Sequence, residues 1–260
     1  MKRVVIIGDL HSGHRAGLTP PAWQFKKPYQ NSEHAKYAEV QQTLWNFITE
    51  QAKRLQPVHL LVVNGDCIEG KGLKNGGREL ITQDRNEQTD MAAECIKIFK
   101  PRNILMTYGT PYHSGTWEDW EDLVADKVSA PRPKDQLWVN IDKAAFNIRH
   151  KTSRSVIPHG RATMILRQQL WETLWADWEE RPASRILIRH HVHYHCYAGD
   201  PRCLVMTGPA LQVYSQYGIR QCEGIVHVGL VWFDIEKNGE YKWANQIVEG
   251  KAFKSAPLQL

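Results

Sequence analysis

Residues 4–12 begin with an apolar run and end in polar side chains: Val4-Val-Ile-Ile-Gly-Asp9-Leu-His11-Ser12. Four consecutive apolar residues before a glycine are typical of a strand that is buried on both faces. In α/β folds, the chemistry collects just beyond the carboxyl ends of such strands. This stretch therefore predicts a buried first strand, a sharp turn, and a carboxylate and an imidazole placed for function directly after it.

The same pattern of apolar run, turn and polar side chain recurs four more times. The later examples are Asn64-Gly-Asp66, Tyr108-Gly-Thr-Pro-Tyr-His113, Ile157-Pro-His159-Gly160 and Arg189-His-His191-Val-His193. Each piece alone has a structural alternative, since Asp9 fits a helix cap, His11 a surface residue and Asp66 a turn former. Asp-x-His and His-x-His are each expected by chance about once in every two such chains. Five occurrences at strand ends favour a shared functional site over these separate explanations.

The segments between these points alternate apolar strands with helical patterns. Helices are predicted over 33–55, 79–99, 116–128 and 162–180, and early buried strands over 58–64 and 103–108. Later strand candidates are 137–140, 144–150, 185–189, 204–207, 224–234 and 241–248. Alternation followed by strand-rich sequence predicts a layered α/β fold whose sheets face each other, in one domain over residues 1–260.

Composition and charge exclude several classes of protein. Hydrophobic residues at 42% and charged residues at 23% exclude a disordered chain, a collagen-like fibre and a polytopic membrane protein. The chain lacks the run of about 7–15 apolar residues of a secretory signal and the run of about 20 of a membrane span. We therefore expect a soluble, cytoplasmic protein without a membrane partner. The net charge of +5 favours anionic partners only slightly.

The side chains at the strand ends suit a particular group of metals. Mixed carboxylate and imidazole ligands are typical of Mn²⁺, Fe, Zn²⁺ and Ni²⁺ sites. The five cysteines are widely spaced and include no Cys-x-x-Cys, which argues against a thiolate site or a disulfide framework.

The order Asp-x-His, Gly-Asp, glycine loop with histidine, histidine and His-x-His resembles that of the calcineurin-like metallophosphoesterases. The resemblance extends from Asp9 to about Gly218. The stretches Asn64–Gly72, Gly109–His113 and Thr207–Leu211 look most like phage and prophage members. The resemblance implies two packed mixed β-sheets flanked by helices, in a hydrolase that uses two divalent metal ions.

The resemblance also implies a role for each motif residue. Six metal ligands are expected: Asp9, His11 and His193 on the first ion, His159 and His191 on the second, and Asp66 bridging both. Mn²⁺ is the metal expected first, with Fe, Zn²⁺, Ni²⁺ or Mg²⁺ as alternatives. Two ions about 3.5–4 Å apart polarise a phosphate, and a hydroxide held between them attacks phosphorus in line. The expected substrate is a phosphate ester, a diester before a monoester, with a nucleotide or a nucleic acid as alternatives.

One departure from the family pattern lies in the loop after the third strand. The family has Gly-Asn-His there, whereas this chain has Gly109-Thr110-Pro-Tyr-His113-Ser-Gly115. His113 is predicted to be the acid that protonates the leaving group, and a ligand role in place of the missing asparagine is the alternative. Two other functions stay open: a nuclease of the same family, and a catalytically weakened metal-binding scaffold.

The last motif contains more histidines than the two metal ligands that are expected from it. His190 and His191 point in opposite directions on an extended segment, so only one of them faces a metal easily. The pair His191 and His193 is preferred over the pair His193 and His195 because of its position at the strand end.

A tryptophan-rich helix follows the fourth motif. It carries an apolar series at a spacing of three or four residues: Leu170, Trp171, Leu174, Trp175 and Trp178. Such a series predicts core packing or an oligomer face. The sequence leaves the oligomeric state open.

Overall fold

The structure is a computed structural model, and it describes residues 1–73, 76–114, 118–215 and 225–249. Parts of four sequence predictions lie outside the described residues. They are Gly115, residues 116–117 of a predicted helix, residue 224 of a predicted strand, and Gly218 at the end of the family resemblance.

The first sheet has the strand order β10-β9-β1-β2-β3. Its strands are β1 (Lys2–Ile7), β2 (Leu60–Asn64), β3 (Ile104–Thr107), β9 (His227–Ile235) and β10 (Tyr241–Glu249). The first three strands are parallel, and β9 is antiparallel to both of its neighbours. The carboxyl ends of β1, β2 and β3 therefore lie at one edge of the sheet.

The second sheet has the strand order β4-β5-β6-β8-β7. Its strands are β4 (Leu137–Ile141), β5 (Ala144–Ile148), β6 (Ile186–Arg189), β7 (Cys196–Gly199) and β8 (Leu204–Thr207). The three inner strands are parallel, and each edge strand is antiparallel to its neighbour. Both sheets are mixed, which confirms the predicted fold of two mixed sheets.

Alternate side chains of the strands fill the space between the sheets. Val4 and Ile6 of β1 belong to the apolar cluster that also contains Phe146 and Ile188 of the second sheet. Phe146 and Phe233 meet edge to face with their ring centroids 5.2 Å apart. Because side chains alternate along a strand, the residues between them face the opposite way, toward helices. This alternation explains why the strands of the first half are apolar throughout.

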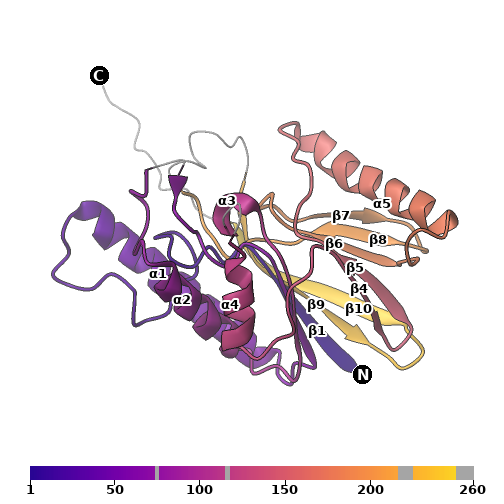
Figure 1. The fold of residues 1–260 in the computed structure, drawn as a ribbon, viewed down its shortest axis with the longest axis horizontal. Helices are drawn as coiled ribbons and strands as arrows, with labels where there is room; N and C mark the ends of the chain where they lie inside the picture. Colours follow the sequence, from indigo (N-terminus) through magenta and orange to yellow (C-terminus); the bar gives the residue numbers. More distant parts are fainter. Residues whose placement is uncertain (74–75, 115–117, 216–224, 250–260) are drawn as a thin grey trace.

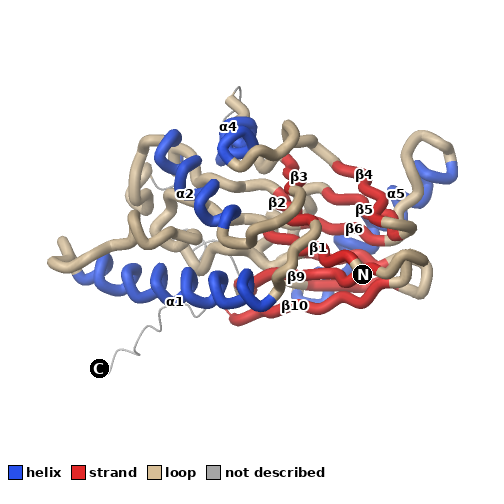
Figure 2. The backbone as a smooth tube through the Cα atoms, turned by 90° about the horizontal axis from the view of Figure 1, so that it is seen from below, coloured by secondary structure: helices blue, strands red, loops and turns tan. Residues whose placement is uncertain are grey.

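Helices cover the outer face of each sheet (Figures 1 and 2). The first sheet carries α1 (Ser32–Arg54), α2 (Arg85–Lys97) and α4 (Trp120–Lys127), with the short α3 (Pro111–Ser114) at its edge. Leu44 and Ile48 of α1 pack into the cluster that contains Val5 and Ile7 of β1. The second sheet is covered by α5 (Arg161–Asp177), which follows the 3-10 helix η2 (Pro158–Gly160). None of the helices within the described residues combines the length and the apolar composition that a membrane crossing requires.

Several element boundaries differ from the sequence predictions, and one strand was not predicted. The helix expected over 79–99 begins at Arg85, because the Asp84 side chain accepts a hydrogen bond from Asn86 N at 2.8 Å and caps it. The strand expected over 144–150 ends at Ile148. Strand β7 was not predicted, because its sequence Cys-Tyr-Ala-Gly lacks the β-branched residues that mark strands.

Candidate metal centre

The polar strand ends of both sheets meet at one place in the fold. Asp9 and His11 follow β1, and Asp66 follows β2. His150 follows β5, whose backbone pairing continues as Arg149 N donates to Ile188 O at 3.1 Å and His190 N to His150 O at 2.9 Å. The segment after β6 supplies His191 and His193. The parallel pairs β1–β2 and β5–β6 thus bring carboxylates from one sheet to imidazoles from the other.

The backbone at these positions is held in a conformation that side chains disfavour. Five residues of the site have positive φ: Asp9 at 50°, His11 at 46°, Asp66 at 49°, His191 at 77° and His193 at 55°. A non-glycine residue in this left-handed region costs on the order of 1–3 kcal/mol, and such residues cluster at functional sites. These five turns aim their side chains into the same space.

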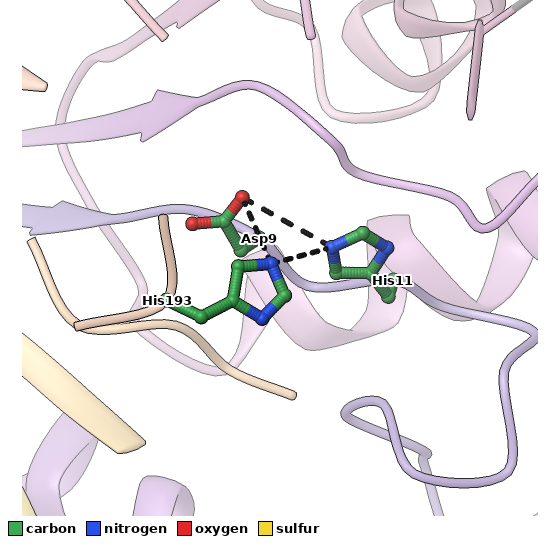
Figure 3. A group of neighbouring side chains, drawn as sticks. All are labelled: Asp9, His11 and His193. Carbon is green, nitrogen blue, oxygen red and sulfur yellow. Dashed lines mark hydrogen bonds and ion pairs between the residues drawn. The ribbon is translucent and has the colours of Figure 1, made fainter. Parts of the chain in front are cut away.

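The first ligand group consists of Asp9, His11 and His193 (Figure 3). The His11 Nε2 and His193 Nε2 atoms are 3.2 Å apart. Asp9 Oδ1 lies 3.6 Å from His193 Nε2 and 4.0 Å from His11 Nε2. One atom of each side chain therefore points to a common centre, and the group could hold a metal ion.

The second ligand group consists of Asp66, His150 and His191. His150 Nε2 lies 3.0 Å from Asp66 Oδ2 and 3.8 Å from Asp9 Oδ1. The two groups are therefore neighbours, and a carboxylate of each lies close to the same imidazole.

The chemistry of these side chains fits a cation. Asp9 Oδ1 is buried and has no hydrogen-bond partner among the described residues. Buried polar atoms normally have a partner, and a metal ion bound beside this oxygen would provide one. Burial raises the pKa of Asp9 to about 7, although the neighbouring His150 acts in the opposite direction. Burial lowers the pKa of His191 to about 4, so this imidazole is neutral and free to bind a metal at neutral pH.

His159 is the one predicted ligand that the structure does not bring to the others. It lies exposed on η2, in the segment that leads into α5. His150 takes its place, because its Nδ1 donates a hydrogen bond to Asn64 O at 2.7 Å and directs Nε2 toward the two carboxylates. Burial opposes protonation of His150, but Asp66 beside it outweighs this effect and raises the pKa to about 9. Among the described residues, His150 and not His159 therefore belongs to a group that could hold a metal ion.

The other histidines of the last motif point away from the centre. His190 Nδ1 accepts from Asn64 Nδ2 at 2.8 Å, and burial lowers the pKa of His190 to about 3. His195 Nδ1 donates to Thr207 O at 2.7 Å, on β8. The structure thus places His191 and His193, and neither His190 nor His195, in the groups that could hold a metal ion.

Glu69 is a site residue that the sequence interpretation missed. Its Oε2 accepts from His11 Nδ1 at 2.9 Å, and it lies 3.5 Å from His113 Nδ1. A carboxylate on Nδ1 fixes the ring tautomer and leaves Nε2 free for a metal. Burial opposes ionisation of Glu69, but the neighbouring His14 and the bond from His11 lower its pKa to about 2. The signal was a carboxylate three residues after Asp66, in Gly65-Asp-Cys-Ile-Glu69.

His113 lies on α3 at the border of both ligand groups. Its Nδ1 donates to Glu69 O at 3.0 Å, and its Nε2 lies 3.9 Å from Asp66 Oδ2. Burial opposes protonation, but Asp66 and Glu69 outweigh it and raise the pKa of His113. His113 also forms a third group with His11 and Glu69 that could hold a metal ion. Its position is therefore compatible with both predicted roles.

Thr110 contacts Asp66 through its backbone and its side chain. Thr110 N donates to Asp66 Oδ1 at 2.6 Å, and Thr110 Oγ1 lies 3.2 Å from the same oxygen. The residue that replaces the family's asparagine thus orients a candidate metal ligand.

Comparison with known proteins gives matches among solved structures alone. No protein-family model and no curated protein matches the chain. An archaeal phosphodiesterase is 15% identical, with a TM-score of 0.47 and coverage of 94% of this chain and 99% of that one. Vps29 of Entamoeba histolytica, complexed with zinc, is 12% identical, with a TM-score of 0.42 and coverage of 96% and 99%. A predicted phosphoesterase of Streptococcus pneumoniae is 11% identical, with a TM-score of 0.38 and coverage of 94% and 98%.

Proposed function

We propose that the chain is a metal-dependent phosphoesterase of the calcineurin-like type that binds two divalent cations and hydrolyses phosphodiesters. The observation that carries this proposal is the convergence of two adjoining carboxylate–imidazole groups from two sheets, with a buried carboxylate oxygen, Asp9 Oδ1, that has no hydrogen-bond partner among the described residues. The stretch Asn64–Gly72 supports the further proposal of a phage or prophage type.

The ligand groups suggest how the cations would be held. Asp9, His11 and His193 would hold the first, and His150 and His191 would hold the second. Asp66, whose Oδ2 lies 3.0 Å from His150 Nε2 and 3.9 Å from His113 Nε2, is proposed to bridge them. Bound divalent cations supply Lewis-acid polarisation of a phosphate and make a water more acidic. Mn²⁺ is proposed first, with Fe, Zn²⁺, Ni²⁺ or Mg²⁺ as alternatives, because the ligands are oxygen and imidazole nitrogen.

His113 is proposed to protonate the leaving group. Its Nδ1–H is held by Glu69 O, so the opposite nitrogen, Nε2, carries the mobile proton toward the centre. Burial opposes protonation of this imidazole, but Asp66 and Glu69 outweigh burial and raise its pKa, which favours the protonated form that an acid requires. Glu69 thus orients both rings, His113 through its backbone carbonyl and His11 through its carboxylate.

The test of this function combines metal analysis with hydrolysis. The chain is stripped with a chelator and reloaded with Mn²⁺, and its metal content and its hydrolysis of a bis-aryl phosphate are measured. We expect two ions per chain and metal-dependent release of the aryl alcohol. Bound metal without hydrolysis for any metal would instead support the scaffold function. Digestion of supercoiled and single-stranded DNA then separates a nuclease from an esterase for small substrates.

A further inference from the structure

The outer face of α5 exposes large apolar side chains to solvent. Leu170 is 60% exposed, Trp171 52% and Trp178 61%. Ile165 is the buried residue of this helix, and the opposite face looks away from the sheets at the margin of the molecule (Figure 1). Proteins that act as monomers rarely leave contiguous apolar patches of this kind uncovered.

Apolar residues form a continuous stripe along the helix. Leu166, Leu170, Leu174 and Trp178 follow one another at intervals of four residues; Leu174 is half-buried and the other three are exposed. Residues four apart lie on the same side of a helix, one turn above the other. The stripe therefore runs along the whole of α5 and is suited to contact another helix lengthwise.

The charges around the stripe have the opposite order to the one that would stabilise the helix through its dipole. The exposed charges of its N-terminal half and of the preceding loop are Lys151, Arg154 and Arg167, and those at its C-terminal end are Asp177, Glu179 and Glu180. The loop lies along the first half, since Arg167 Nη2 donates to Ser153 Oγ at 3.0 Å. Helices are stabilised by acidic groups at the N-terminus and basic groups at the C-terminus. This helix has the reverse, so its own stability does not explain the arrangement.

A second copy of α5, running antiparallel to the first, would cover the apolar stripe and would also place opposite charges against each other. With the two-fold axis at the level of residue 172, Leu170 faces Leu174 of the second copy, and Leu166 faces Trp178 of the second copy. Arg167 and Asp177 each lie five residues from position 172, so Arg167 of each copy faces Asp177 of the other. Isologous contacts of this kind are the usual way in which homodimers form. We propose that the outer face of α5 is the contact surface of a two-fold symmetric homodimer.

The mass of the protein in solution tests the apolar stripe. Sedimentation velocity over a series of protein concentrations should show a species of twice the chain mass. Leu170→Glu places a charge in the middle of the stripe and should give a monomer with an unchanged circular dichroism spectrum. A wild-type chain that stays monomeric throughout, or a dimer that persists in Leu170→Glu, would overturn the proposal.

Charge exchange tests the antiparallel arrangement. Arg167→Asp and Asp177→Arg each turn two attractive contacts into two repulsive ones, and each should weaken the dimer by about tenfold or more. An equimolar mixture of the two variants should restore it, because both charge pairs of the mixed dimer again join opposite charges. Lys237→Asp, in the exposed turn between β9 and β10, makes a similar charge change away from α5 and should leave the dimer intact. Two variants that remain monomeric when mixed would contradict the antiparallel contact.

Discussion

His150 and His159 form a matched pair of histidines on the same connection between β5 and α5. His150 is 1% exposed and contacts both carboxylates of the centre, whereas His159 is exposed on η2. His150→Ala should remove the second cation and abolish hydrolysis. His159→Ala should leave the rate within about tenfold, a change of about 1.4 kcal/mol in the barrier. Metal content and hydrolysis are measured for both, and a reversed order of effects would restore the original assignment of His159.

His113 can be assigned to acid or ligand by comparing two substrates. As an acid, its loss should slow a poor alkyl leaving group by about 10²–10⁴-fold, because that group needs a proton to depart. An activated aryl ester, whose phenolate leaves without a proton, should be hydrolysed nearly as before. The His113→Ala variant is assayed with both esters across a Mn²⁺ titration. Equal losses that excess metal rescues would make His113 a ligand instead.

Glu121 is a buried carboxylate on α4 that the proposed reaction does not use. It is 1% exposed, and neither of its carboxylate oxygens has a hydrogen-bond partner among the described residues. Burial, and next the negative charge of Asp66, raise its pKa from 4.5 to about 7. The neutral carboxyl therefore contributes fully below the unfolded pKa of 4.5, and this contribution is lost as the pH rises through about 7.

The variant Glu121→Gln should lack this pH dependence. Its stability relative to wild type should increase by about 3 kcal/mol between pH 4.5 and pH 8, measured by urea unfolding of the chelator-treated protein. Glu50→Gln, on the exposed side of α1, serves as the control. A stability difference that is the same at both pH values would show that Glu121 titrates normally.

The ends of β6 and β8 are packed as closely as their glycines allow. The two strands pair in parallel up to Arg189 and Thr207, and the ring of His190 lies directly beyond them. A Cβ on Gly208 would lie 2.2 Å from His190 Nε2, and one on Gly8 would lie 2.6 Å from His190 Cδ2. The buried imidazole thus fills the space between strand ends of both sheets and supports the turn that carries His191.

Gly208→Ala should therefore destabilise the fold by about 1–3 kcal/mol, the usual cost of overpacking a core. The same change in a His190→Ala background should cost less, because the ring no longer occupies the space. A double-mutant cycle by urea unfolding measures this coupling. Independent, additive effects would mean that the strand ends relax without the ring.

At the scale of the whole molecule, the candidate centre connects the two sheets. Asp9 and Asp66 follow strands of the first sheet, while His150, His191 and His193 follow strands of the second. Cations bound there would hold the sheets together in the folded chain and would be released on unfolding. Free metal at a hundredfold excess over its dissociation constant should add about 2.7 kcal/mol of stability per site.

Metal removal should therefore lower the unfolding midpoint, and Mn²⁺ should restore it. Acid should have the same effect as removal only when the pH falls through about 4, the pKa to which burial lowers His191, because a protonated imidazole nitrogen cannot bind a metal. The Asp66→Asn variant, which lacks the carboxylate proposed to bridge the cations, should respond much less to Mn²⁺. Equal midpoints with and without bound metal in the wild type would mean that the centre does not connect the sheets.

Local sequence was sufficient to predict most of the candidate centre. An apolar run followed by a turn and a metal-binding side chain is a short-range pattern, and it located Asp9, His11, Asp66, His191 and His193. The same reasoning predicted the layered sheets, because buried strands are marked by their own composition. These features depend on residues that are neighbours in the chain.

Only the tertiary structure decided which remaining side chains join the centre. His150 reaches it because β5 pairs in parallel with β6, which follows only after α5, and this pairing leaves no mark beside His150 in the sequence. Glu69 reaches two imidazoles because the turn after β2 folds back against the loops after β1 and β3. The sequence by itself thus determined which strand ends carry ligands. The packing of one sheet on the other decided which histidine completes the set, because that choice depends on contacts between distant segments.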